Sequence, residues 1–138
     1  MSHNFSKGAF VLKKNPDVEQ PYHFVLVGPN QNTLLLSENY VNSHGARNGI
    51  DSVRLNGDDE SNYEGRVTTD DRFYFVLKAK NYEIIGRGMF HKTEQQRDLD
   101  IKDVMKHCRD AILVDETSED EGGATTSEPN RNGSNRYA

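Results

Sequence analysis

The chain has 138 residues, with 17 basic and 22 acidic residues, a net charge of −5 and a hydrophobic fraction of 33%. This length suits one domain, or two small repeats that share a core, and the low apolar fraction indicates that part of the chain is not folded. A single cysteine, Cys108, excludes a disulfide framework and a multi-cysteine zinc site, and is compatible with a reducing compartment.

Nothing in the sequence reads as a targeting or membrane segment. The first residues lack the apolar stretch of a signal peptide, and no apolar run approaches the length of a membrane span. We therefore expect a soluble, cytoplasmic protein that does not engage a membrane.

The first half of the chain predicts three strands followed by a helix. Strands are expected at 8–14, 22–27 and 33–36, separated by turns rich in Pro and Asn, and residues 1–8 form an N-terminal extension whose last residue begins the first strand. Asn42 or Ser43 is suited to cap a helix that ends near residue 56, because a short side-chain oxygen can accept from the free amides of the first turn. The apolar stripe of this helix contains Gly49, a costly residue there unless the helix approaches its support closely.

The same order of elements returns in the second half, after a polar linker over residues 58–62. Strands are expected at 63–68, 73–79 and 84–89, and Thr93 is positioned to cap a second helix. The apolar stripe of this helix extends to Ile112, which predicts a helix longer than the first. At an offset of 51 residues, Phe24-Val25-Leu26 matches Phe75-Val76-Leu77. Such internal repetition indicates two units that bury their apolar faces against each other.

From residue 115 onward the composition changes. Residues 115–138 hold six acidic and two basic residues and no Leu, Ile, Val or Phe. Such a segment cannot bury enough apolar area to offset the entropy of ordering, so we predict a disordered acidic tail. The predicted organisation is an extension (1–8), a first repeat (9–57), a linker (58–62), a second repeat (63–114) and the tail.

The first repeat resembles the YegP-like family of small, mostly bacterial proteins of unknown function. The resemblance rests on Ser37-Glu38-Asn39-Tyr40, on the run from Gly45 to Val53, and on the preceding hairpin from Tyr22 to Leu26. It covers residues 9–111 and implies a tandem strand-strand-strand-helix repeat with a tendency to duplicate or pair. It implies no activity.

The second repeat departs from the family pattern. Asp100 stands where the first repeat has Gly49, and Met89-Phe90-His91 replaces Glu38-Asn39-Tyr40. Two interpretations remain open: the second helix packs at a greater distance, or its surface serves another purpose.

Repeats and resemblance together predict an α+β fold: two β-β-β-α repeats forming one antiparallel sheet of about six strands, with two helices on one face. Strand alternation then places Phe24 and Phe75 in the core and a second set of side chains on the helix-free face. Because that set is unusually apolar for a solvated face, we expect it to bind a protein partner or a second copy of the chain. The candidate interaction face consists of His23, Val25, Val27, Tyr74, Val76 and Lys78.

Two other classes of function have less support. No pair of histidines, or of a histidine and Cys108, has the helical spacing of a metal site, and no nucleophile–base pair or phosphate-binding glycine loop is visible. We therefore expect no catalytic residues, no cofactor and no metal.

Weak binding of single-stranded nucleic acid through the sheet is the alternative function. Tyr74 and His23 could stack on bases. The near-neutral charge of residues 1–114 and the acidic tail argue against it, and deletion of residues 115–138 should strengthen any binding. The basic residues available for phosphates are Arg72, Lys78, Lys80 and Arg87.

Overall fold

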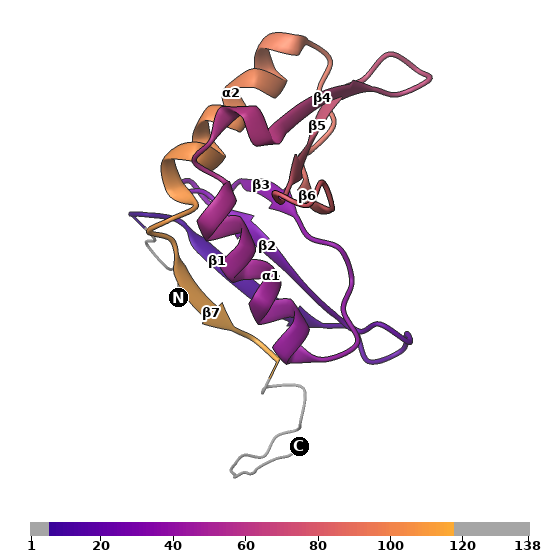
Figure 1. Ribbon diagram of the computed structural model, residues 1–138, viewed down its shortest axis with the longest axis vertical. Coiled ribbons are helices and arrows are strands. Elements are labelled where there is room, and N and C mark those ends of the chain that lie inside the picture. Colours follow the sequence, from indigo (N-terminus) through magenta and orange to yellow (C-terminus); the bar gives the residue numbers. More distant parts are fainter. Residues whose placement is uncertain (1–5, 118–138) are drawn as a thin grey trace, which may run out of the picture.

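The structure is a computed structural model and describes residues 6–117. Within this range the chain forms one seven-stranded sheet and two α-helices (Figure 1). In chain order the elements are β1 (Ala9–Lys14), β2 (Tyr22–Val27), β3 (Thr33–Leu36), α1 (Ser43–Asn56), the 3-10 helix η1 (Glu60–Asn62), β4 (Tyr63–Val67), β5 (Phe73–Lys78), β6 (Ile84–Arg87), α2 (Glu94–His107) and β7 (Ile112–Asp115). The fold is therefore α+β, as predicted.

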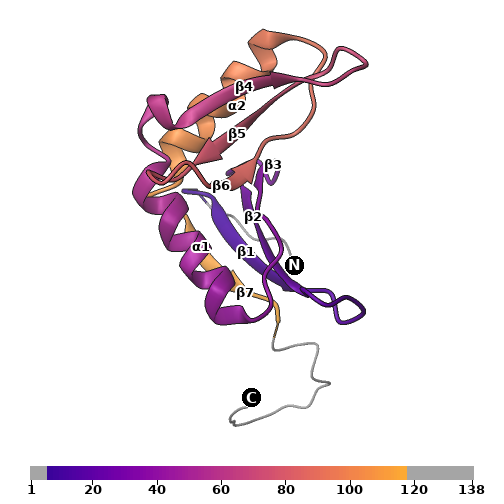
Figure 2. The same cartoon turned by 45° about the vertical axis from the view of Figure 1, so that its right-hand side comes forward.

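The strand order is β4-β5-β6-β3-β2-β1-β7. Each repeat contributes an antiparallel three-stranded meander, and the two meanders join through β3 and β6, where Leu36 pairs with Arg87. From this junction the hairpins β1–β2 and β4–β5 diverge (Figure 2). The repeats are thus halves of one sheet.

The predicted strand number is wrong by one. Residues 112–115 form β7, which pairs with β1 in parallel, with Ala9 opposite Ile112. Helix α2 consequently ends at His107, and it has the same 14-residue length as α1. Asp115, which we expected to open the tail, is the last residue of β7 and pairs with Arg47 of α1. The remainder of the predicted tail, from residue 118, lies outside the described residues.

Polar side chains cap both helices at their first turns. The Asn42 side chain accepts a hydrogen bond from the Gly45 amide at 2.8 Å, and Thr93 accepts one from the Gln96 amide at 3.2 Å. Each cap satisfies an amide that has no partner within its helix. The two capping residues are 51 residues apart, so the two repeats also share the way in which their helices begin.

One cluster of buried side chains combines both repeats and both helices. Phe24 and Phe75 are fully buried and belong to it, which confirms that the two repeats share a core. Its other members are Phe10, Leu12, Leu26, Leu34, Leu35, Ala46, Ile50, Val53, Leu77, Ile85, Val104, Cys108 and Ala111. Because each helix packs on strands of both meanders, neither repeat has a separate interior.

Candidate interaction surface

The predicted interaction residues lie on one continuous face of the sheet, which we call the outer face. In an antiparallel ladder, directly opposite residues project to the same side. Val25 lies opposite Leu36, Leu36 opposite Arg87, and Arg87 opposite Val76. This row joins Val25 and Val76 across the junction between the repeats, on the side away from Phe24 and Phe75.

The first-repeat half of the outer face is apolar but not exposed. Val25 is only 8% exposed and packs in a small cluster with Ala9 and Val11, against which Val27, Leu36 and Val114 pack. The expectation that Val25 is solvated is therefore wrong, because β1 and β7 extend the sheet beside it. His23 is partly buried, and burial, with a smaller contribution from Lys13, lowers the pKa of its imidazole.

The second-repeat half is polar around a buried valine. Val76 is 3% exposed, which also contradicts the expected exposure. On the neighbouring strand β4, Glu64 accepts from Lys78 at 2.6 Å and from Arg66 at 3.0 Å. These hydrogen bonds, that from Lys78 first, lower the pKa of the Glu64 carboxyl. Charged side chains thus surround Val76 on this half of the face.

Beside Val76 lies a group of side chains that we call the aromatic–arginine patch: Arg72, Tyr74, Arg87 and Phe90. Phe90 is 39% exposed. Its ring meets that of Tyr74 edge to face, with centroids 5.1 Å apart. The guanidinium carbons of Arg72 and Arg87 lie 4.6 Å and 5.1 Å from the Phe90 centroid, within the range of cation–π attraction.

The aromatic–arginine patch belongs to the second repeat alone. At the 51-residue offset its members align, in chain order, with Pro21, His23, Leu36 and Asn39. Sequence reasoning found Tyr74, Arg72 and Arg87 but missed Phe90, which follows β6 in a segment outside any strand. The replacement of Asn39 by Phe90 was the available signal, since a large apolar side chain had entered an exposed loop position.

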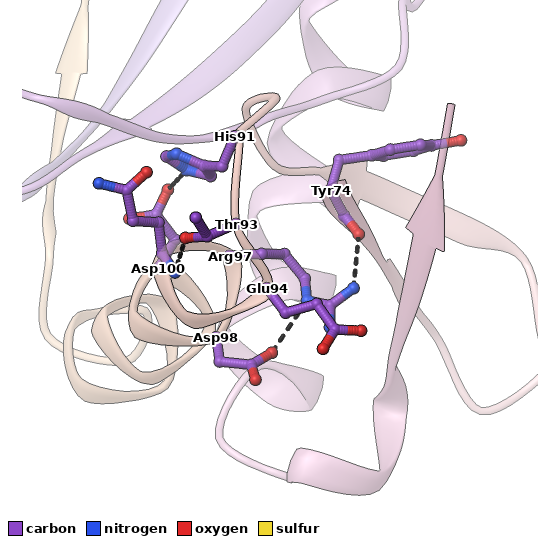
Figure 3. Close-up of polar contacts among 8 residues, drawn as sticks. Tyr74, His91, Thr93, Glu94, Arg97, Asp98 and Asp100 are labelled. Atoms are coloured by element: carbon purple, nitrogen blue, oxygen red, sulfur yellow. Dashed lines mark hydrogen bonds and ion pairs between the residues drawn. The ribbon is translucent and has the colours of Figure 1, made fainter. Parts of the chain in front are cut away.

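A second feature confined to the second repeat is a polar cluster at the start of α2 (Figure 3). His91 Nε2 lies 2.6 Å from Asp100 Oδ2, and both side chains are largely buried. Arg97, whose side chain is 11% exposed, contacts Asp98 at 2.9 Å and the carbonyl oxygen of Tyr74 at 3.5 Å. Figure 3 shows this carbonyl turned toward Arg97 while the Tyr74 ring points away.

The polar cluster occupies positions that are small or aromatic in the first repeat. There the Tyr40 ring lies over Gly49, where a Cβ would overlap its hydroxyl, whereas in the second repeat His91 and Asp100 take these positions and bond to each other. A His–Asp pair can orient an imidazole for proton transfer. Among the described residues, however, no Ser, Thr or Cys side chain hydrogen-bonds to His91. The contacts that are present indicate that His91 and Asp100 fill, in the second repeat, the space that Tyr40 and Gly49 fill in the first.

Residues 6–117 contain neither a cluster of metal-binding side chains nor a membrane-spanning helix. In that range no group of three or more His, Cys, Asp or Glu side chains is placed to hold a metal ion. Neither described helix is long and apolar enough to cross a bilayer.

Two β-β-β-α units at a fixed offset, joined in one sheet over one core, define a duplicated α+β protein. The chain belongs to the family described as domain of unknown function DUF1508, which matches it twice, over residues 17–64 and 69–115. The first match omits β1 and runs past α1 into β4, and the second omits β4 and runs past α2 through β7. Each match therefore covers the last two strands and the helix of one repeat, together with the chain that follows the helix.

Relatives of the chain are bacterial proteins without an assigned function. It is 40% identical over 112 residues to a UPF0339 protein of Pasteurella multocida, covering 81% of this chain and 96% of that one. It is 37% identical over 110 residues to the UPF0339 protein YegP of Escherichia coli K12, covering 80% and 98%.

Two solved structures share the fold. The solution NMR structure of E. coli YegP aligns with a TM-score of 0.73 at 37% identity, covering 80% of this chain and 93% of that one. The solution NMR structure of a UPF0339 protein from Shewanella oneidensis aligns with a TM-score of 0.75 at 36% identity, covering 82% and 94%.

Proposed function

We propose that this protein is a non-enzymatic, cytoplasmic interaction module that binds a macromolecular partner through the outer face of its sheet. Both helices contribute to the cluster around Phe24 and Phe75, and the second apolar cluster contains no residue of either helix. This distribution supports an arrangement in which both helices cover one side of the sheet and leave the outer face available. The observation that carries the proposal is the aromatic–arginine patch.

The exposure of the side chains on each half of the outer face indicates which half binds the partner. The valines of the first-repeat half are shielded by neighbouring strands, so they offer little apolar area to a partner. In the second-repeat half, Phe90 is 39% exposed and the side chain of Arg72 is 49% exposed. Aromatic and arginine side chains are the types that contribute most to binding at protein surfaces. The second-repeat half therefore has the composition of a binding site.

The test compares matched variants in co-purification from the native host. Phe90→Ala removes the exposed ring of the patch, whereas Leu99→Ala removes a side chain on α2 that is 60% exposed. We expect wild type and Leu99→Ala to retain the same protein or nucleic acid, and Phe90→Ala to lose it. Equal recovery with all three proteins would contradict the proposed function.

Sedimentation of the same variants over a range of concentrations tests the particular case of a second copy as partner. Self-association that persists in Leu99→Ala and is weakened in Phe90→Ala would identify the partner as the chain itself. A patch-independent dimer would place the contact elsewhere and count against the proposal.

A further inference from the structure

We infer that the ligand of the aromatic–arginine patch is a single-stranded nucleic acid; this inference rests on the proposed function and specifies its partner. Single strands are bound without sequence preference by aromatic side chains on which bases stack, set in a basic groove that follows the backbone. The patch and its immediate surroundings provide both components on one face of the sheet.

The stacking component consists of Phe90 and the groups around it. The guanidinium groups of Arg72 and Arg87 lie over the Phe90 ring. A guanidinium is planar and weakly hydrated, so it can itself stack on a base or remain on the ring as a base arrives. Tyr74 supports Phe90 from the sheet side through its edge-to-face contact.

The charge component is locally positive although the whole chain is acidic. Arg66 and Lys78 share the single carboxylate of Glu64, and Arg72 pairs with Asp70 at 3.1 Å. Arg87 contacts the Phe90 ring and the Gly88 carbonyl oxygen, and no carboxylate of the described residues lies within ion-pair distance of it. Within these contacts, four cations accompany two carboxylates.

Basic side chains continue past the end of β5. An open hollow of about 460 Å³ lies there, and its lining includes Lys78, Lys80 and Tyr82 together with Glu64, which pairs with Lys78. Tyr82 is 81% exposed, which gives a second aromatic side chain near the same cations. A strand of several nucleotides could therefore contact Phe90 at one end and Tyr82 at the other.

A single strand fits this surface better than a duplex or an acidic protein segment. Stacking needs an accessible base face, and in a duplex those faces are buried within the helix. An acidic segment without apolar side chains would use the cations but would leave the exposed rings without a contact. Loss of the ring should therefore separate these ligands.

The experiment measures fluorescence anisotropy of labelled single-stranded RNA and DNA oligomers of about ten nucleotides. The full chain is titrated at about 50 mM and about 200 mM salt. The matching duplex and inorganic polyphosphate serve as competitors. We expect both single strands to bind, affinity to fall with salt, and both competitors to be weaker.

Variants then separate stacking from charge. Phe90→Ala should weaken binding by about fivefold or more, and Phe90→Tyr should retain it, because only the latter keeps a ring. Arg72→Gln should lower the slope of log affinity against log salt by about 0.7, the value for one lost phosphate contact on a single strand. The matched control is Arg47→Gln on α1. The Arg47 side chain is 43% exposed, and its replacement should leave the slope unchanged.

The inference is overturned by any of three results. These are absence of binding at low salt, equal competition by polyphosphate or duplex, and unchanged affinity in a Phe90→Ala variant with a native circular dichroism spectrum. If the oligomers do not bind while Phe90→Ala still abolishes co-purification of a protein, the ligand class is wrong and the proposed function stands. If the oligomers do not bind and co-purification is equally strong in every variant, both fail.

Discussion

Replacement of Gly49 by Ala tests the close approach of α1 to the sheet. A Cβ at this position would overlap the Tyr40 hydroxyl and lie 2.9 Å from Cε2 of Phe24. Tyr40 is partly exposed and can move, but Phe24 is fully buried and cannot. Ala gains about 1 kcal/mol of helix propensity over Gly, whereas overpacking costs about 1–3 kcal/mol. We expect Gly49→Ala to be about 1 kcal/mol less stable than wild type.

Gly45 in the same helix provides the matched control. A Cβ there would lie 3.4 Å from the Asn42 side-chain oxygen and 3.4 Å from Cδ1 of Tyr40, which is ordinary contact. Gly45→Ala should therefore gain up to about 1 kcal/mol from propensity alone. The two variants should differ by about 2 kcal/mol, or about 1 M in the urea midpoint for a typical denaturant slope.

Urea unfolding followed by circular dichroism measures both variants. Tyr40→Phe removes the nearest overlapping atom, so it should recover part of the loss when combined with Gly49→Ala. If Gly49→Ala is as stable as Gly45→Ala, the packing of α1 does not require glycine and the reasoning is refuted.

Three further predictions concern the second repeat and β7. His91→Tyr combined with Asp100→Gly recreates the first-repeat pair, so a double-mutant cycle should give a favourable coupling of about 0.5–3 kcal/mol, and additive losses would contradict the pairing. Burial, then the Asp58 charge, raises the pKa of the Cys108 thiol to about 11 from its ordinary 9.0. The stability that this neutral thiol contributes is fully present below its ordinary pKa of 9.0, and it is lost as the pH rises through the raised pKa of about 11. Cys108→Ala should flatten that part of the stability curve, and an unchanged pH dependence would refute the assignment. Finally, a chain ending at Ala111 should unfold at a lower urea concentration than one ending at Thr117, because only the longer chain can pair β7 with β1, and equal midpoints would show that β7 contributes no stability.

Local signals in the sequence predicted most of the fold correctly. The periodicity of 22–27 and 33–36 gave the observed bounds of β2 and β3, and polar caps marked both helix starts. These features depend on near neighbours in the chain, so the residues themselves specify them. The repeat then placed Phe24 and Phe75 in one core, since neither unit could bury its apolar face alone.

The end of the second repeat could not be predicted in the same way. Ala111 and Ile112 continue the apolar spacing of α2, so periodicity alone extends the helix through them. The chain turns instead because β1 has an unpaired edge, and residues 112–115 satisfy its backbone groups in parallel. That edge lies about a hundred residues away in sequence, where no local pattern can indicate it.

For the candidate surface, too, the sequence predicted what depends on near neighbours in the chain and missed what depends on distant ones. Strand alternation correctly placed Val25 and Val76 on the face away from Phe24 and Phe75. It could not give their exposure, because Val25 is shielded by side chains of other strands. Phe90 was missed because it lies outside every strand, and its neighbours Arg72 and Arg87 meet it only in the folded chain.

The parallel pairing of β7 with β1 also affects the order in which the protein can be completed. During synthesis the N-terminal repeat leaves the ribosome first, and domains generally fold as units in that order. Here β1, the first strand to be made, pairs at the edge of the sheet with β7, the last strand of the described residues. A nascent chain therefore carries an open edge at β1 until residues 112–115 have been made, so the two repeats can complete their sheet only together.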